Sequence, residues 1–119
     1  KLLNLMLEQR DCQDLTPLMR ASRDGNIPMV KLFVENEANV NAKDEKGWTS
    51  LMHGVDYRKV ILTLLKAGAD PNIESNQGES ALSMAIEDAS IGEAYALWRG
   101  GAQLHSDALQ QALEMEDIY

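Results

Sequence analysis

One pattern recurs three times along the chain at a nearly constant spacing. Each copy has a tight turn, then a Thr or Ser, then a run of apolar residues. The hydroxyl residues are Thr16, Thr49 and Ser80, so the steps are 33 and 31 residues (16 to 49 and 49 to 80). A Ser or Thr in this place accepts a backbone N–H and begins a helix. Because one such unit cannot bury its apolar face alone, the period predicts a stacked array.

A second landmark follows each hydroxyl residue at a similar distance. It reads Glu37-Ala38-Asn39-Val40-Asn41, then Gly68-Ala69-Asp70-Pro71-Asn72, and then Gly101-Ala102. Between the two landmarks of the first copy, Asp24-Gly25 ends one helix and Pro28 opens another, since Gly favours a left-handed helix end and Pro fits the first helical turn. Each period therefore predicts a turn followed by two helices.

These motifs resemble those of ankyrin repeats. Thr16-Pro17-Leu18 is similar to the Thr-Pro-Leu-His motif of that family, and the segment 68–72 is similar to its Gly-Ala-Asp-x-Asn motif. The segment 41–47 is similar to its hairpin, and the resemblance covers roughly residues 14–104. It implies an all-α ankyrin-repeat solenoid of stacked helix-turn-helix units with short β-hairpin fingers.

We expect a single ankyrin-repeat domain over residues 1–119. Its predicted parts are an N-terminal cap (1–13), repeat 1 (14–42), repeat 2 (43–73), repeat 3 (74–104) and a C-terminal capping helix (105–119) that begins near Ser106 or Asp107. Full hairpin arms are predicted near 39–48 and 70–79. The segment 10–16 looks too short for a third arm.

The helix pairs carry further expectations. Met29, Val30, Leu32, Phe33 and Val34 are expected to form a buried stripe, and Ile91 is expected to lie near the inward side of its helix. Repeat 2 lacks two residues around 56–58, because its second landmark follows the hydroxyl residue by 20 positions (49 to 69) and not by 22 as in repeat 1 (16 to 38). We expect its first helix to end early and the pair to tilt.

The histidine of the family motif is missing in this chain. Met19, Met52 and Ser83 occupy its place. The resemblance implies that this imidazole ties neighbouring turns together, so its loss weakens the expectation of an inter-repeat polar network. Methionine can fill the space by packing. His53, one position later, is expected to be a surface or capping residue.

The sequence gives little support for catalysis or for cofactor binding. The sequence has no Gly-rich phosphate loop and no Cys–His pair at metal spacing, and Glu87, Asp88 and Glu93 are expected to be a solvated helix end. His105, Ser106 and Asp107 are the residue types of a catalytic triad, but neighbouring side chains at one helix start would point in different directions and would not converge. We therefore expect no enzyme, no metal and no cofactor. The sequence contains no apolar run of 18 residues, so no membrane span is expected. The lone Cys12 is compatible with a reducing compartment.

Negative charge is concentrated at one end of the chain. Residues 1–75 carry ten Lys or Arg and eleven Asp or Glu, a net charge of −1, whereas residues 76–119 carry one Arg against eight acidic residues, a net charge of −7. Position along a solenoid follows position in the sequence. The acidic end would repel nucleic acid and anionic membranes and would attract a protein with a basic surface. It could equally serve only to keep the end of the stack soluble.

The resemblance implies a binding surface on the concave side, formed by the fingers and the inner-helix ends. The predicted partner-binding residues are Arg23, Asp24, Lys43, Glu45, Lys46, Trp48, Asp56, Tyr57, Glu74, Asn76, Gln77, Glu79, Glu87 and Asp88. Trp48 is the first candidate anchor, because burial by its own repeat is not expected, and Tyr57 is the second. Trp48→Ala is expected to weaken partner binding by roughly 2 kcal/mol and to spare the fold. The alternative for Trp48 is packing across its own finger.

The sequence therefore predicts a non-catalytic protein–protein interaction module, monomeric by itself, inside the cell and most simply in the cytoplasm. The resemblance leaves a second function open, a regulatory or ligand-sensing fragment of a larger enzyme or receptor, because one fold can carry many functions.

Overall fold

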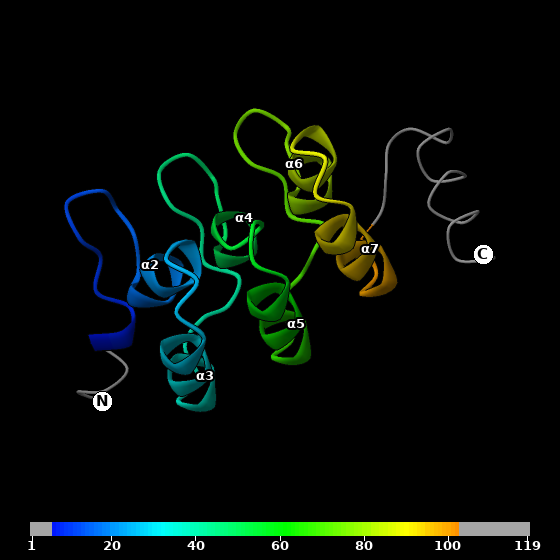
Figure 1. Cartoon of the computed structure of the whole chain (residues 1–119). Helices are drawn as coiled ribbons and strands as arrows, with labels where there is room; N and C mark the ends of the chain where they lie inside the picture. Colours follow the sequence, from blue (N-terminus) through cyan, green and yellow to red (C-terminus); the bar gives the residue numbers. More distant parts are fainter. Residues whose placement is uncertain (1–5, 103–119) are drawn as a thin grey trace.

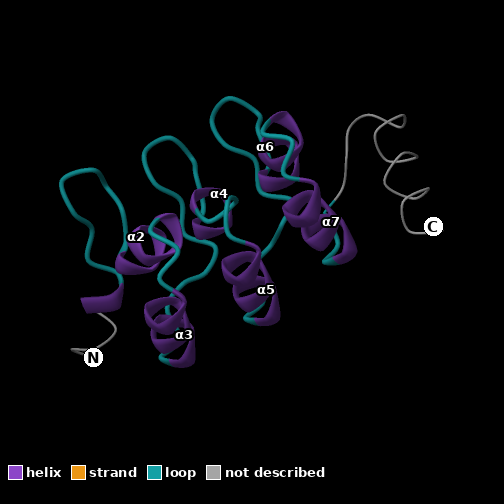
Figure 2. Ribbon diagram, viewed as in Figure 1, coloured by secondary structure: helices purple, strands orange, loops and turns teal. Residues whose placement is uncertain are grey.

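The computed structural model describes residues 6–102. The helices with both ends in this range are α2 (Pro17–Arg23), α3 (Ile27–Glu35), α4 (Ser50–His53), α5 (Arg58–Lys66), α6 (Ala81–Glu87) and α7 (Ile91–Arg99). Across this part of the chain the segments between helices are loops and turns with no β-strand (Figure 2). The predicted C-terminal capping helix (105–119) lies outside the described residues, as do residues 1–5 of the predicted N-terminal cap.

The helices form two parallel rows. Helices α2, α4 and α6 make an inner row, and α3, α5 and α7 make an outer row (Figure 1). Neighbouring helices within each row pack together, and each inner helix also packs on the outer helix that follows it in the chain. The all-α solenoid predicted from the period is confirmed.

Each inner helix begins at the predicted hydroxyl residue. The side chains of Thr16, Thr49 and Ser80 accept hydrogen bonds from the backbone N–H groups of Met19, Met52 and Ser83. The caps are themselves almost fully buried, so each one satisfies a donor that water does not reach. Gly25, with φ +68°, follows the end of α2 as predicted.

The core lies between the two rows and is built from aliphatic side chains and methionine. Leu18, Leu51 and Leu82 occupy equivalent places in the three inner helices and are at most 1% exposed. Met19 and Met52 are buried to the same degree. The packing role predicted for the two methionines is therefore confirmed.

Three loops, which we call the fingers, project beside the inner row (Figure 1). The first finger is residues 10–15, the second is 43–48 and the third is 74–79. Each tip is closed by a backbone hydrogen bond across five residues, Asp11 N to Leu15 O (3.0 Å) in the first, Asp44 N to Trp48 O (2.9 Å) in the second and Ser75 N to Glu79 O (2.7 Å) in the third. The expectation that the segment 10–16 is too short for a full arm was wrong. A turn closed by a hydrogen bond between residues 11 and 15 fits within this segment.

Hydrogen bonds between repeats join the bases of successive fingers. The N–H of Asp70 donates to Asn41 Oδ1 (2.8 Å), and Asn72 Nδ2 donates to the carbonyl oxygen of Gly101 (3.2 Å). The N–H of Asn39 donates to Glu8 in the same manner. Side-chain amides of the second landmark and the carboxylate of Glu8 thus supply an inter-repeat polar network that does not depend on the missing histidine.

The outer helices are less buried than expected. Val30 is fully buried and Phe33 and Val34 are half-buried, but Met29 and Leu32 are 36% and 48% exposed, and Ile91 is 59% exposed. The prediction of burial was wrong for these three residues. An outer helix contacts the inner row on one side and its neighbours at its flanks, so its remaining surface faces solvent even where the sequence is apolar.

Repeat 2 accommodates its missing residues through a short inner helix. Helix α4 has four residues, whereas α2 and α6 have seven each. It ends at Gly54, whose φ of −95° is not left-handed. A Cβ atom at Gly54 would lie 2.4 Å from Val60 Cγ1, so glycine lets the start of α5 approach closely. The early helix end is confirmed, and the tilt of the pair stays a prediction.

Candidate functional site

A pocket of about 350 Å³ lies between the first two fingers and the inner row. It brings together four residues that were predicted from separate places in the sequence, Arg23, Glu45, Lys46 and Trp48. It also contains residues that sequence reasoning did not select, namely Cys12, Gln13, Leu15, Asp44 and His53. Cys12 and Gln13 were missed because the first finger was not foreseen.

Asp44 organises the wall of this pocket. Its Oδ1 accepts hydrogen bonds from the N–H groups of Lys46 and Trp48, both at 2.9 Å, and thereby shapes the tip of the second finger. Its Oδ2 lies 2.9 Å from His53 Nε2 at the end of α4. The carboxylate is almost fully buried, with a side-chain exposure of 4%. One side chain thus connects the finger to the inner helix.

His53 differs from its predicted role. Its side chain is only 9% exposed and contacts Asp44, so the expectation of a surface residue was wrong. His53 and Asp44 are nine positions apart, and only the turn at Gly47 returns the chain close enough for them to meet. The imidazole therefore ties a finger to an inner helix, although it stands one place later than the histidine of the family motif.

Trp48 lies against His53 and is half-buried. The two ring centroids are 5.1 Å apart and the ring planes are inclined by 51°. The indole also packs against the hydrophobic core. The expectation that its own repeat would not bury Trp48 was therefore wrong in part, because the indole contacts His53 of the same repeat. Packing across its own finger stays a prediction, and Trp48 also lines the pocket. Because the indole packs against His53 and the core, we expect Trp48→Ala to change fold stability as well as binding.

Burial lowers the pKa of His53 below its usual 6.5, and the hydrogen bond to Asp44 opposes this effect without reversing it. The folded protein therefore binds fewer protons than the unfolded chain when the pH falls below 6.5. Its free energy of unfolding is expected to decrease over that range. Urea unfolding of the wild type and His53→Gln, at pH 7.5 and 5.5, measures this contribution. We expect the wild type to lose more stability on acidification, and an equal loss in both proteins would contradict the prediction.

The third finger packs onto the second. Asn76 Nδ2 donates to the carbonyl oxygen of Glu45, and the N–H of Asn76 donates to the carbonyl oxygen of Lys46, both at 2.9 Å. Asn76 was predicted to contact a partner, but its amide is used within the array. Gln77 is exposed beside it and Glu79 is half-buried.

The other predicted residues are distributed over the same face. Tyr57 is 41% exposed, and its ring carbons lie within 2.8 Å of the position that a Cβ atom at Gly25 would occupy, so it covers the preceding repeat. Six more are exposed at finger bases and inner-helix ends: Asp24, Lys43, Asp56, Glu74, Glu87 and Asp88. These residues are distributed over all three repeats, and none of them lines the pocket.

Asp11 gives the first finger a fixed negative charge. The N–H of Leu15 and the Arg20 guanidinium are the main causes that lower the pKa of Asp11 to about 2. Asp11 thus occupies the same turn position as Asp44, but its second partner is an exposed arginine, not a buried histidine. The first and second fingers therefore differ in the burial of this carboxylate although their backbone turns agree.

Neither a metal centre nor a membrane span was found in the part of the chain that the structure describes. Between residues 6 and 102, no three His, Cys, Asp or Glu side chains are grouped so that they could hold a metal ion. None of the helices in that range combines the length and hydropathy needed to cross a bilayer.

Comparisons with known proteins agree with this geometry. The family described as ankyrin repeats (3 copies) matches residues 1–75. The chain is 35% identical over 74 residues to ankyrin repeat and SAM domain-containing protein 6 of Rattus norvegicus, covering 60% of this chain and 8% of that protein. It is 43% identical over 58 residues to the mitochondrial disaggregase of Homo sapiens, covering 47% of this chain and 8% of that protein.

The fold agrees with a solved structure as well. An ankyrin repeat domain from Acinetobacter baumannii AYE superposes with a TM-score of 0.77 at 27% identity, covering 82% of this chain and 53% of that one. The chain thus spans about half of that domain and less than a tenth of the two curated relatives. Because the family match covers more than half of the chain and the two rows of helices agree with it, the chain belongs to the ankyrin-repeat family.

Proposed function

We propose that this chain is a non-catalytic module that binds a partner protein on the face formed by its fingers and inner helices. Ankyrin repeats generally serve protein–protein interaction, and solenoids present extended surfaces of this kind. The observation that carries the proposal is the pocket between the first two fingers, which combines a half-buried indole with exposed charges of both signs. An aromatic anchor within a polar rim is a frequent arrangement at protein interfaces.

The proposed partner has a basic surface where it meets the third repeat. Glu87 and Asp88 are exposed at the end of α6, and residues 76–119 carry a net charge of −7. A field of this sign favours encounter with a cationic protein and disfavours nucleic acid and anionic membrane. We further propose that the module acts as a monomer in the cytoplasm, where the exposed thiol of Cys12 would remain reduced.

The test is a quantitative capture experiment with the purified, tagged chain as bait. Lys46→Glu changes an exposed side chain of the pocket and leaves the Asp44 contacts in place, which makes it a cleaner probe than Trp48→Ala. We expect captured partner to fall at least tenfold, equivalent to about 1.4 kcal/mol of binding free energy. Glu37→Lys, a charge change of the same size at an exposed residue just beyond α3 that does not line the finger pocket, is expected to retain capture.

A second comparison tests the charge of the partner. Glu87→Lys and capture at high salt should each reduce the same partner, because screening weakens exposed electrostatic attraction. Full capture by Lys46→Glu, or equal losses with Lys46→Glu and Glu37→Lys, would contradict the proposal.

The alternative function is a regulatory or ligand-sensing part of a larger enzyme or receptor. The observation that favours it is the small share of each curated relative that this chain spans, including a named disaggregase. Thermal unfolding in the presence of nucleotides tests this alternative, since a ligand that binds only the folded state raises its stability. A rise abolished by Lys46→Glu would place a small ligand in the finger pocket.

A further inference from the structure

The outer row carries an apolar surface that the proposed function does not use. Four large hydrophobic side chains are exposed there, Met29, Leu32, Leu62 and Ile91, with exposed fractions of 36% to 59%. Single exposed apolar residues are ordinary on protein surfaces, whereas a hollow lined by several of them marks an interaction site. A docking surface therefore requires that one of these residues lines a hollow together with further apolar side chains.

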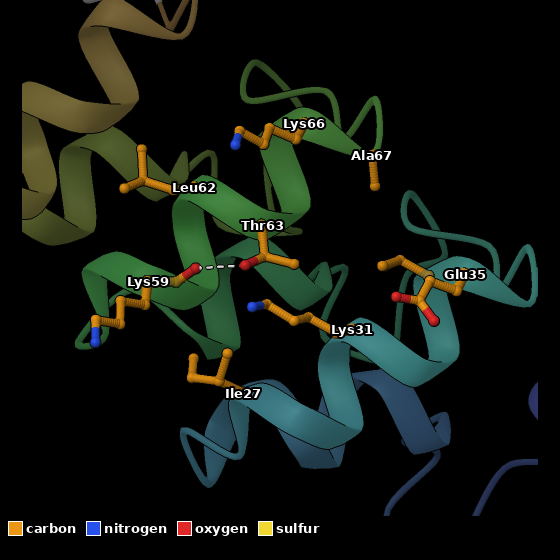
Figure 3. A pocket seen from close by; sticks show the side chains of 9 residues that line it. Ile27, Lys31, Glu35, Lys59, Leu62, Thr63, Lys66 and Ala67 are labelled. Atoms are coloured by element: carbon orange, nitrogen blue, oxygen red, sulfur yellow. Dashed lines mark hydrogen bonds between the residues drawn. The ribbon is translucent and has the colours of Figure 1, made fainter.

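Leu62 meets this requirement, because it lines an open groove of about 670 Å³ between α3 and α5. Ile27 and Val34 contribute further apolar surface from α3, and Ala67 lies just beyond the end of α5. In Figure 3 the side chain of Ile27 points into the space between the two helices. The Thr63 hydroxyl donates to the carbonyl oxygen of Lys59 (2.8 Å), so this polar group is already satisfied on its own helix.

Lysines surround this apolar floor. Lys31, Lys59 and Lys66 line the groove, and Lys31 extends across it toward α5 (Figure 3). Glu35 is the one carboxylate of the lining. Within residues 6–102 none of the three lysines forms an ion pair. Three ammonium groups are thus held around an apolar surface with little internal compensation.

The positive charge continues along the outer row. A second groove of about 630 Å³ lies between α5 and α7, shares Leu62 and Lys66 with the first, and adds Arg58 and Arg99. The two grooves together are lined by five cations and a single carboxylate, in a chain whose net charge is −8. The lining of these two grooves is therefore opposite in charge to the chain as a whole.

We propose that the groove between α3 and α5 is a docking site for an acidic amphipathic helix of a partner protein. Its apolar face would rest on Ile27, Val34 and Leu62, and its carboxylates would meet the surrounding lysines. Helices bind grooves of this kind through apolar residues spaced at i, i+3, i+4 and i+7. Each bordering helix has nine residues, about 14 Å at 1.5 Å per residue, which accommodates between two and three turns of a bound helix.

This site is separate from the one in the proposed function. The two lie on different rows of the solenoid and attract partners of opposite charge. A partner on the fingers therefore leaves the outer groove open, and the chain can join two proteins at once. Failure of either proposal leaves the other intact, because their test substitutions do not overlap in the binding surface.

The experiment uses a fluorescein-labelled synthetic peptide of about 14 residues, with leucine at the i, i+3, i+4 and i+7 positions and glutamate elsewhere. One control peptide has the same composition in an order that breaks the apolar face. The other control peptide has lysine in place of glutamate. Fluorescence anisotropy is measured with the wild type, Lys31→Glu/Lys66→Glu, Leu62→Ser and Lys43→Glu. Lys43 is an exposed lysine of the second finger and provides the matched control.

We expect the double charge reversal and Leu62→Ser each to weaken binding at least tenfold, with Lys43→Glu unchanged and both control peptides at least tenfold weaker. Amide chemical shifts should change on α3 and α5 when the peptide is added. Circular dichroism verifies that the variants fold, as the substituted side chains are exposed. Equal binding by the double variant, equal binding of the reordered peptide, or shifts confined to the fingers would each overturn the proposal, as would absence of binding at millimolar peptide.

Discussion

Gly47→Ala is expected to lower the free energy of unfolding by about 3 kcal/mol, the sum of a backbone cost of 1–2 kcal/mol and the loss of hydrogen bonds worth 0.5–1.5 kcal/mol each. Gly47 has φ +79°, a conformation that L-residues with a Cβ rarely adopt. That Cβ would also lie 2.8 Å from the backbone N of Asn76. The third finger must then move, which breaks both Asn76 bonds to the second finger. Urea unfolding followed by circular dichroism measures the loss.

Gly78→Ala is the matched control for this prediction. Gly78 occupies the same turn position in the third finger with φ +78°, but a Cβ there would meet nothing within 4 Å. It should therefore show the backbone cost alone, about 1–2 kcal/mol. Equal losses in the two variants would mean that the contact between the second and third fingers contributes nothing to stability.

Asp44→Ala is the second substitution with a large expected effect. It removes the acceptor for the N–H groups of Lys46 and Trp48 and leaves His53 without its buried partner. An unsatisfied buried donor costs about 1–3 kcal/mol, so we expect a total loss of about 3 kcal/mol in the free energy of unfolding. Tryptophan fluorescence should respond as well, because the indole of Trp48 rests on the imidazole of His53. Urea titration at pH 7.5 gives both readings.

Two variants separate the parts of this effect. Ser75→Ala removes the equivalent acceptor of the third finger. Its hydroxyl accepts two backbone N–H bonds at 3.2 Å, from Gln77 and Glu79, and neither comes from an inner helix. Its expected cost is about 1 kcal/mol. Asp44→Asn keeps a carbonyl oxygen for the turn and should fall between the two. If Asp44→Ala proves as mild as Ser75→Ala, then the contact with His53 does not stabilise the fold.

If both results are obtained, the second finger is the rigid centre of the binding face. Asp44 would hold it to the inner row and Asn76 would hold it to the third finger. Preorganised loops lose less conformational entropy when a partner binds. The stability of this finger would then contribute directly to the affinity of the proposed module.

Local chemistry made much of the fold predictable. Thr16, Thr49 and Ser80 each cap a helix through a bond to a backbone group three residues away, so the relevant geometry is contained in a few neighbouring positions. The same holds for Gly25 at the end of α2. A tight turn before Thr16 was predicted, and the error was to judge the segment 10–16 too short for a full arm. The turn closes within five residues, with Asp14 at φ 64° where the other two fingers have glycine. Asp tolerates a positive φ better than most residues, but an Asp in a sequence does not by itself predict a positive φ.

The candidate site was predictable in part. Lys46, Trp48 and Arg23 line the finger pocket, as their positions near the turn and the inner-helix end indicated. The pairing of His53 with Asp44, the use of Asn76 within the array and the charged groove on the outer row were not foreseen. Each of them depends on the distance between segments that are separated in the sequence or belong to different repeats.

The sequence by itself determined the period, the helix starts, the two-helix unit and the family, because these follow from capping, turn preference and apolar spacing over short distances. Only the tertiary structure decided which apolar residues are covered and which polar residues are partners. A side chain such as Leu62 is buried or exposed according to what the neighbouring repeats place beside it. The stacking of three repeats leaves the outer flank of α5 open, and so the exposed leucine and its lysines form a surface that no local pattern predicts.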